Sequence, residues 1–309
     1  MRRSRRPGPG AGLLSLAVIL AACGGDRESA DAPEQEETAA PATITVAEAG
    51  FATPESVLHD EATDVYLVSN INGGPADKDD NGFISRLSPD GEVLELMWID
   101  GSSEGVTLNA PKGLALQGGT LYVADIDCIR MFDGTTGAPA GETCVEGATF
   151  LNDVAAAPDG SVVFTDSGLD AAFAPTGADA VYRLRDGEVT VVVEGAGLGA
   201  PNGVVATRDG IVVVTFMSGE VFRLDAEGSR EQLMETSGLQ LDGVVALPDG
   251  RLLLSSWADS CVYSMGADGT TACVVEGVEA PADIGFDRTR NRVLVPLFNA
   301  NAVRIQGIG

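Results

Sequence analysis

The chain is short of basic residues and has a single histidine. It carries 19 Lys and Arg against 46 Asp and Glu, which gives a formal net charge of -27 at pH 7. Such a charge repels nucleic acid and anionic lipid surfaces, so we expect neither as a partner. The lone His59 is expected beside a strand-end turn in a structural role, which disfavours a histidine-dependent reaction. Neither a His-Glu-x-x-His nor a Gly-x-x-x-x-Gly-Lys motif occurs.

Long apolar runs are also scarce. Residues 13–22 form one, but it is too short to span a bilayer comfortably and it follows a basic start. Residues 1–22 therefore indicate a signal peptide, and its Leu-Ala-Ala-Cys end resembles the lipidation motif of bacterial lipoproteins, with Cys23 as the lipidated residue. An ordinary signal peptide beside a chance cysteine is the alternative. By resemblance to Gram-negative lipoproteins, Gly24 after the cysteine favours the outer membrane, facing the periplasm or the exterior.

Residues 23–42 lack the large apolar side chains that a core needs. The segment has no Phe, Leu, Ile or Val after Cys23 and carries six acidic residues, which is typical of a disordered tether. Residues 43–309 are uniform in composition, with no internal linker and no useful helical periodicity. We expect one all-β domain there.

Short polar corners that run straight into an apolar strand recur six times. Their first polar residues are 57, 40, 50, 40 and 40 residues apart, which is the period of a four-stranded propeller blade. The corners are Pro54-Glu55-Ser56-Val57, Pro111-Lys112-Gly113-Leu114, Leu151-Asn152-Asp153-Val154, Pro201-Asn202-Gly203-Val204, Leu241-Asp242-Gly243-Val244 and Pro281-Ala282-Asp283-Ile284.

Each of the first five units contains four strand-like runs separated by tight turns. The last unit ends at Gly309 without a fourth strand, whereas residues 43–47 form a β-prone run with no other partner. The N-terminal strand is therefore expected to close the ring, which leaves no long exposed edge. The sequence predicts a six-bladed β-propeller.

Four cysteines remain after Cys23, in two pairs. Each pair falls on the expected third and fourth strands of one blade, where opposed side chains come within disulfide range in an oxidising compartment. A metal-thiolate site is the alternative, although no Cys-x-x-Cys spacing occurs. The predicted disulfides are Cys128 with Cys144 and Cys261 with Cys273.

The corners lie where each innermost strand begins, so their first side chains are expected to converge on one end of the central channel. Two carboxylates and two amide oxygens among them form a hard donor set, which suits Ca²⁺ or another hard divalent cation and disfavours zinc. Capping and turn residues without an ion are the alternative. We call this set the ring residues: Glu55, Asn152, Asn202 and Asp242.

The identity and order of the ring residues resemble the metal site of the regucalcin and gluconolactonase family, which includes senescence marker protein and luciferin-regenerating enzyme-like proteins. Diisopropyl fluorophosphatase and the paraoxonases are more distant relatives. The resemblance covers residues 50–309 and implies one central calcium held by the ring residues. It further implies that calcium polarises a lactone or ester carbonyl, with Asp242 as ligand and general base or nucleophile.

Two residues depart from that family's pattern. Phe150 stands where family lactonases that act on sugar acids commonly have Arg, which argues against a sugar lactone. Lys112 occupies the second-blade corner, where it binds an anionic substrate group or neutralises surplus carboxylate. Candidate substrate-binding residues are Lys112, Phe150, Phe216, Trp257 and Asp283, with Met217 and Phe298 near the same rim and Asp125, Asp153 and Asp166 at the edge of the channel.

A second cation loop is suggested by Asp77, Asp79 and Asn81, which match the first half of an EF-hand loop. Ser88 replaces the bidentate Glu at the twelfth position, so a solvated acidic loop is the alternative. Taken together, the sequence predicts a monomeric, lipid-anchored, calcium-dependent hydrolase of a lactone or related ester. A non-catalytic, calcium-stabilised propeller that binds a small ligand or a protein partner is the second hypothesis.

Overall fold

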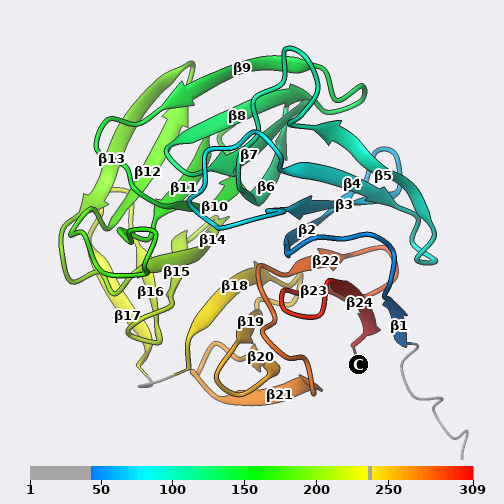
Figure 1. Cartoon of the computed structure of the whole chain (residues 1–309). Helices are drawn as coiled ribbons and strands as arrows, with labels where there is room; N and C mark the ends of the chain where they lie inside the picture. Colours follow the sequence, from blue (N-terminus) through cyan, green and yellow to red (C-terminus); the bar gives the residue numbers. More distant parts are fainter. Residues whose placement is uncertain (1–42, 236–238, 309) are drawn as a thin grey trace, which may run out of the picture. The chain divides into compact units, whose positions relative to one another are not determined.

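Every regular element in the described residues is a β-strand. The computed structural model describes residues 43–235 and 239–308, in which the strands form six four-stranded antiparallel sheets. Figure 1 shows the sheets around a common centre in chain order, with β2, β6, β10, β14, β18 and β22 as the innermost strands. This confirms the predicted six-bladed propeller. The predicted signal peptide, Cys23 and the tether lie outside the described residues and stay predictions.

The first three blades each use four consecutive strands. The first contains β2 (Pro54–Asp60), β3 (Val65–Asn70), β4 (Phe83–Leu87) and β5 (Val93–Asp100). The second contains β6 (Pro111–Gln117), β7 (Thr120–Asp125), β8 (Cys128–Asp133) and β9 (Pro139–Cys144). The third contains β10 (Leu151–Ala156), β11 (Val162–Asp166), β12 (Ala180–Arg185) and β13 (Glu188–Glu194).

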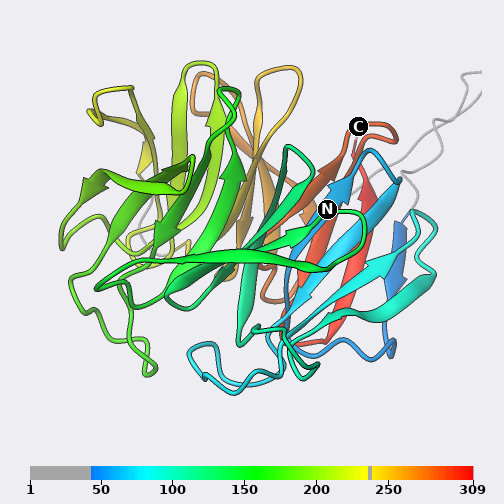
Figure 2. The same ribbon diagram turned by 90° about the horizontal axis from the view of Figure 1, so that it is seen from above.

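The sixth blade closes the ring with the two ends of the described chain. β1 (Thr43–Val46) is its outermost strand and pairs with β24 (Ala302–Gly307), the closure that the sequence predicts (Figure 2).

The fourth blade contains β14 (Pro201–Thr207), β15 (Gly210–Thr215), β16 (Glu220–Leu224) and β17 (Arg230–Glu235). The fifth contains β18 (Leu241–Ala246), β19 (Leu252–Ser256), β20 (Cys261–Met265) and β21 (Thr271–Glu276). The sixth contains β22 (Gly285–Asp287), β23 (Arg292–Leu297) and β24 (Ala302–Gly307).

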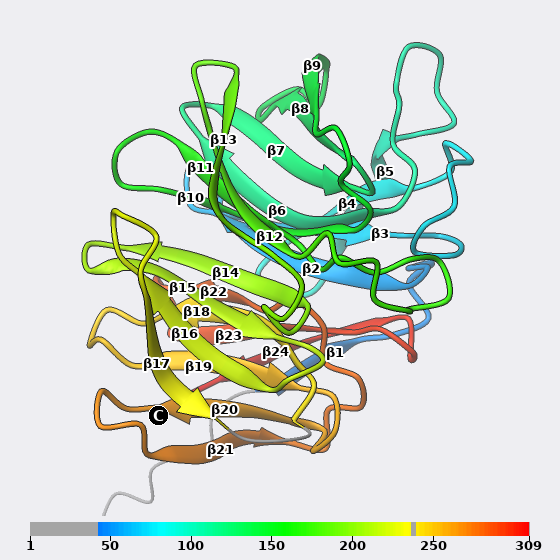
Figure 3. The ribbon, with the colours of Figure 1, turned by 90° about the vertical axis from the view of Figure 1, so that its left-hand side faces the viewer.

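The apolar core lies between neighbouring blades. Second strands such as β11 and β19 are buried along their whole length, because each sheet face packs against an adjoining blade. Figure 3 shows β2, β6, β10 and β14 running close together through the middle of the propeller. No helix in the described part of the chain is long and apolar enough to cross a membrane.

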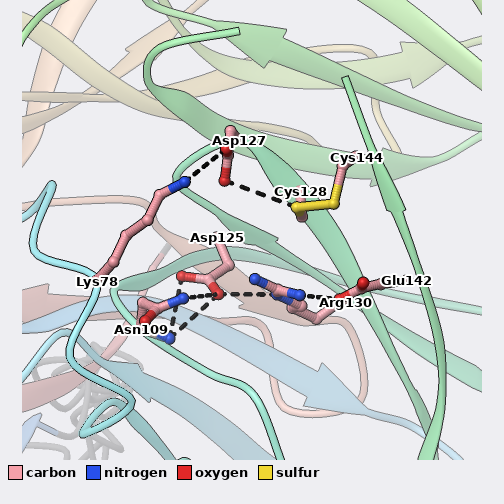
Figure 4. The surroundings of a disulfide bond; sticks show 8 residues. All are labelled: Lys78, Asn109, Asp125, Asp127, Cys128, Arg130, Glu142 and Cys144. Atoms are coloured by element: carbon pink, nitrogen blue, oxygen red, sulfur yellow. Dashed lines mark hydrogen bonds and ion pairs between the residues drawn. A yellow bond between two sulfur atoms is a disulfide. The ribbon is translucent and has the colours of Figure 1, made fainter. Parts of the chain in front are cut away.

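Both predicted disulfides are present. Cys128 lies directly opposite Cys144 on β8 and β9 (Figure 4), and Cys261 on β20 is bonded to Cys273 on β21. Each bond therefore ties the outermost strand of a blade to its neighbour, far along the sheet from the channel.

Candidate metal centre and its cavity

The structure brings the four ring residues together at one end of the channel. Each is the second residue of an innermost strand, on β2, β10, β14 and β18 respectively, and all four line one cavity of about 380 Å³. In each of these strands the pairing with the second strand shifts at the corner, which is a β-bulge. Bulges turn side chains out of the regular pleat and are common beside functional sites.

Backbone strain accompanies four of the corners. The residue before the corner has a positive φ at Thr53 (54°), Ala200 (58°), Gln240 (47°) and Ala280 (45°). Residues with a Cβ adopt this region at a cost, and such strain concentrates at sites that it helps to shape.

Two corner glycines are explained by close packing between blades. A Cβ added to Gly203 would lie 2.5 Å from the carbonyl oxygen of Asp242, and one added to Gly243 would lie 2.7 Å from Cα of Asp283. The Asn-Gly and Asp-Gly pairs therefore provide a candidate ligand followed by a point of contact with the next blade, and they are not hairpin turns.

One oxygen of each ring residue is buried without a hydrogen-bond partner. These atoms are Oε2 of Glu55 and Oδ1 of Asn152, Asn202 and Asp242, and each residue is at most 5% exposed. Buried acceptors without a partner are costly and rare. Four of them in one cavity fit a hard divalent cation bound by oxygen. Among the described residues, no group of three or more His, Cys, Asp or Glu side chains could hold a metal ion. The ring residues are not such a group, because two of their four donors are amide oxygens.

Buried carboxylates give the channel an excess of negative charge. Burial raises the pKa of Glu55 and of Asp242 well above the ordinary value, and the charge of Asp283 adds to both effects. Burial and the same neighbour also raise the pKa of Asp153, and burial raises that of Asp283 to about 7. Four carboxyl groups cannot all ionise here without added positive charge, which a divalent cation would supply.

Lys112 supplies one compensating charge within the cluster. It is 1% exposed, and its Nζ donates to the carbonyl oxygens of Pro75 at 2.8 Å and Ala110 at 3.1 Å. The same atom lies 4.5 Å from the centre of the Phe150 ring. Burial lowers the pKa of Lys112 to about 8, although Glu55 opposes the shift. These contacts hold the ammonium in place.

The residues that follow the ring residues face the opposite end of the channel. Asp283 does not line the cavity with the other predicted substrate-binding residues, because its Oδ2 accepts a 2.5 Å hydrogen bond from Ser56 Oγ. Asp153 accepts from the amides of Val154 and Val204, both at 2.6 Å. A separate cavity of about 480 Å³ on that side is lined by Ser56, Asp153, Val154, Val204 and Asp283.

Aromatic side chains form the walls above the ring residues. Phe150, Phe216 and Trp257 line the cavity as the sequence suggests, and so does Phe298. Met217 is half exposed and is not part of the lining. Sequence reasoning missed Ile71, Pro75, Ser167, Leu169, Phe173 and Gln240.

A repeated position could have revealed part of this wall. The residue directly after the second strand lines the cavity in five of the six blades. In blade order this position holds Ile71, Ile126, Ser167, Phe216, Trp257 and Phe298, of which Ile126 is the one outside the lining.

Asp125 and Asp166 hold the loops that lead into two corners. Asp125 accepts hydrogen bonds from the amides of Asn109 and Ala110 and from Arg130 Nε at 3.0 Å (Figure 4). Asp166 does the same for Thr149 and Phe150. Their role is to fix the backbone just before Lys112 and Asn152.

Two other groups of potentially reactive side chains lie away from the ring residues. His59 is buried on β2, bonds to Asp64 at 3.2 Å and lines the opposite cavity. Residues 101–105 read Gly-Ser-Ser-Glu-Gly, which matches the letters of a serine-nucleophile motif. That segment follows β5, the outermost strand of its blade, and Ser103 is exposed there.

The predicted second cation loop is exposed and internally bonded. Asp77 Oδ2 accepts from the amide of Gly74 at 3.1 Å, and Asp79 Oδ2 accepts from Asn81 Nδ2 at 2.6 Å. These bonds are those of a solvated turn, and the loop's affinity for a cation stays a prediction.

Solved structures of known proteins share this fold. A gluconolactonase from Xanthomonas campestris is 19% identical, with a TM-score of 0.66 over 87% of this chain and 90% of its own. The calcium-binding protein regucalcin from Agrobacterium tumefaciens is 17% identical, with a TM-score of 0.61 over 84% and 90%. Virginiamycin B lyase from Staphylococcus aureus is 12% identical, with a TM-score of 0.62 over 87% and 100%.

No protein-family model matches the sequence, and no curated protein matches it significantly. The likeness to solved structures shows that the chain shares the propeller fold of gluconolactonase-like and regucalcin-like proteins. At these identities the likeness establishes the fold alone.

Proposed function

We propose that the protein is a calcium-dependent hydrolase of a lactone or related ester. The observation that carries the proposal is the set of four partnerless, buried oxygens of the ring residues, which face one cavity in the predicted order. The fold shared with a gluconolactonase and with a calcium-binding protein supports it. A bound divalent cation would polarise the scissile carbonyl group.

The chain's own groups suit the remaining steps of hydrolysis. Asp242 takes a proton from water as the water oxygen bonds to the carbonyl carbon, and returns it to the alkoxide that leaves when the carbon–oxygen bond breaks. Asp242 lines the cavity, where its carboxylate can accept this proton. The aromatic walls exclude bulk water, and Lys112 offsets the charge of Glu55.

A panel of lactones and aryl esters, assayed with calcium and with chelator, tests the proposal. We expect turnover with calcium, none with chelator and none in Asp242→Asn. Because this substitution removes one of four crowded carboxylates, the Tm of the variant in chelator should not fall, which separates lost chemistry from lost folding. Turnover that survives both chelator and Asp242→Asn contradicts the proposal.

Calcium binding without turnover across the panel would favour the second hypothesis, a non-catalytic binding protein. The aromatic cavity supports that reading equally well. A lyase receives less support. One solved virginiamycin B lyase is described as a catalytically inactive variant in which a histidine is replaced, whereas His59 lines the cavity at the other end of this channel.

We further propose that the protein works as a monomer on a small molecule, anchored to the cell envelope through a lipid on Cys23. The motif at residues 20–23 supports the anchor. Expression of the full chain and of Cys23→Ser, followed by membrane fractionation, tests it. The wild type should remain with membranes and the variant should be released; an unchanged distribution contradicts the anchor.

A further inference from the structure

The cavity above the ring residues has walls that are almost entirely apolar. Its volume of about 380 Å³ is within the roughly 300–1,000 Å³ of sites that hold drug-sized ligands, and is generous for a bare lactone ring. The polar atoms are concentrated at the floor, where the ring residues and Lys112 lie. A ligand that reaches the floor therefore leaves its remaining atoms against hydrocarbon and aromatic surface.

Two groups of aromatic rings make this wall continuous. Phe216, Trp257 and Phe298 come from consecutive blades, with ring centres 5.5 and 5.1 Å apart. Phe150 and Phe173 form a second group, 5.9 Å apart, on the third blade. Such contacts fix the rings as flat surfaces for an apolar ligand.

Phe173 lies at the mouth of this cavity. It lines the cavity yet is 46% exposed, and its backbone has a φ of 60°. A half-exposed phenylalanine in a strained conformation costs stability, and contact with an apolar ligand would bury it.

Most polar groups near the walls are already engaged. Ser167 Oγ donates to the carbonyl of Pro201 at 2.7 Å and accepts from Asn152 Nδ2 at 3.0 Å. Lys112 Nζ is held by two carbonyls. The indole Nε1 of Trp257, beside Asp242, is the exception, because it is buried without a hydrogen-bond partner. Of the described lining residues above the floor, exposed Gln240 at the rim is the one that still offers an amide.

We infer that the substrate is a lactone or ester that carries an extended apolar acyl or aryl group and few hydroxyls. A polyhydroxylated sugar lactone would leave its hydroxyls unpaired against the aromatic walls, which is costly. An apolar chain there gains the full benefit of leaving water. This inference rests on the proposed function and names its substrate class.

A homologous series tests the inference: γ-lactones with alkyl tails of increasing length, and glucono-δ-lactone as the hydroxylated comparison. We expect kcat/KM to rise about fourfold per added methylene until the cavity is full. Glucono-δ-lactone should fall at least about tenfold below the long-tailed lactones. Trp257→Ala and Phe298→Ala should flatten the dependence on length, whereas Trp98→Phe, outside the cavity, should keep it.

The outcomes separate the substrate class from the proposed function. Equal kcat/KM across the series, or a preference for glucono-δ-lactone, overturns the inference while hydrolysis stands. If no lactone is turned over with calcium present, the proposed function fails and binding decides the inference. In Trp98→Phe the fluorescence of Trp257 reports binding directly: a Kd that falls with tail length supports an apolar ligand, and a Kd independent of length overturns it.

Discussion

At the scale of single residues, the central channel holds more buried negative charge than its neighbours neutralise. Glu55 and Asp242 contribute buried carboxylates without enough partners, and Asp153 and Asp283 add two more just beyond them. The ammonium of Lys112 offsets one negative charge, and carboxyl groups with a raised pKa lose their charge when they keep their protons. A divalent cation is the remaining way to neutralise the cluster, so the affinity for the cation should depend on Lys112 and on the protonation of these carboxyl groups.

Replacing Lys112 tests how that charge is used. Because two carbonyls hold Nζ within the cluster, we expect Lys112→Met to tighten calcium binding by about tenfold. The calcium-free protein should become less stable at the same time, since Glu55 loses its counter-charge. Isothermal titration and thermal unfolding in chelator measure the two effects. An unchanged calcium Kd with a raised KM for anionic substrates alone would instead assign Lys112 to the substrate.

The pH dependence of the calcium-free protein follows from Asp283. In the unfolded chain an Asp titrates near ~4, whereas in the folded protein its pKa is raised to about 7. Between these values the folded state binds more protons than the unfolded state, so its stability falls as pH rises. We expect Tm in chelator to drop across this window, and Asp283→Asn to flatten the drop. The same slope in Asp283→Asn as in the surface control Glu146→Gln would contradict this.

At the scale of strands, the site depends on how closely the innermost strands approach. Gly203 on β14 packs against the backbone of Asp242 on β18, so the position of one ring residue is set by the residue that follows another. The corner bulges then send consecutive residues to opposite ends of the channel, as with Asn152 and Asp153.

Gly203→Ala should disturb the site through this contact. The added methyl forces β14 and β18 apart, at a cost of about 1–3 kcal/mol in stability and with a marked loss of calcium affinity. Val205→Ala on the same strand removes partly buried apolar surface and should lower stability while leaving the calcium Kd unchanged. Thermal unfolding and calcium titration of both variants measure this. Equal calcium affinities in the two variants would contradict the argument.

Sequence reasoning reached the ring residues because repetition exposed them. One polar slot recurs at the start of each innermost strand, and strand order alone makes those slots converge. Contacts between distant segments were out of reach: the carbonyl of Pro75 that holds Lys112, and the loop that places Phe173 over Phe150. Asp283 lines the cavity at the other end of the channel for a related reason, since its contact with Ser56 of the first blade cannot be read from the letters.

At the scale of the whole propeller, ring closure joins the two ends of the described chain. β1 pairs with β24 through four residues, and Val46 is buried with Leu294 and Val303. Without β1, the edge of β24 would be open to solvent and to other chains.

Truncation separates the role of β1 in closure from any role of the residues before it. A chain that starts at residue 43 keeps β1 and should unfold at the temperature of the longer chain. One that starts at residue 47 should unfold at a lower temperature and aggregate through its open edge. Thermal unfolding and light scattering of the two truncated chains measure this. Equal Tm values and equal scattering would show that β1 contributes nothing to closure.

The central claim is that the four ring residues together bind one hard divalent cation. Isothermal titration of the chelator-treated protein with calcium tests it most directly, with Asn152→Ala and the matched loop variant Asp79→Asn measured alongside. We predict one site per chain, lost or greatly weakened in Asn152→Ala and unchanged in Asp79→Asn. The absence of any binding in the wild type, or binding lost in Asp79→Asn and kept in Asn152→Ala, would contradict the claim.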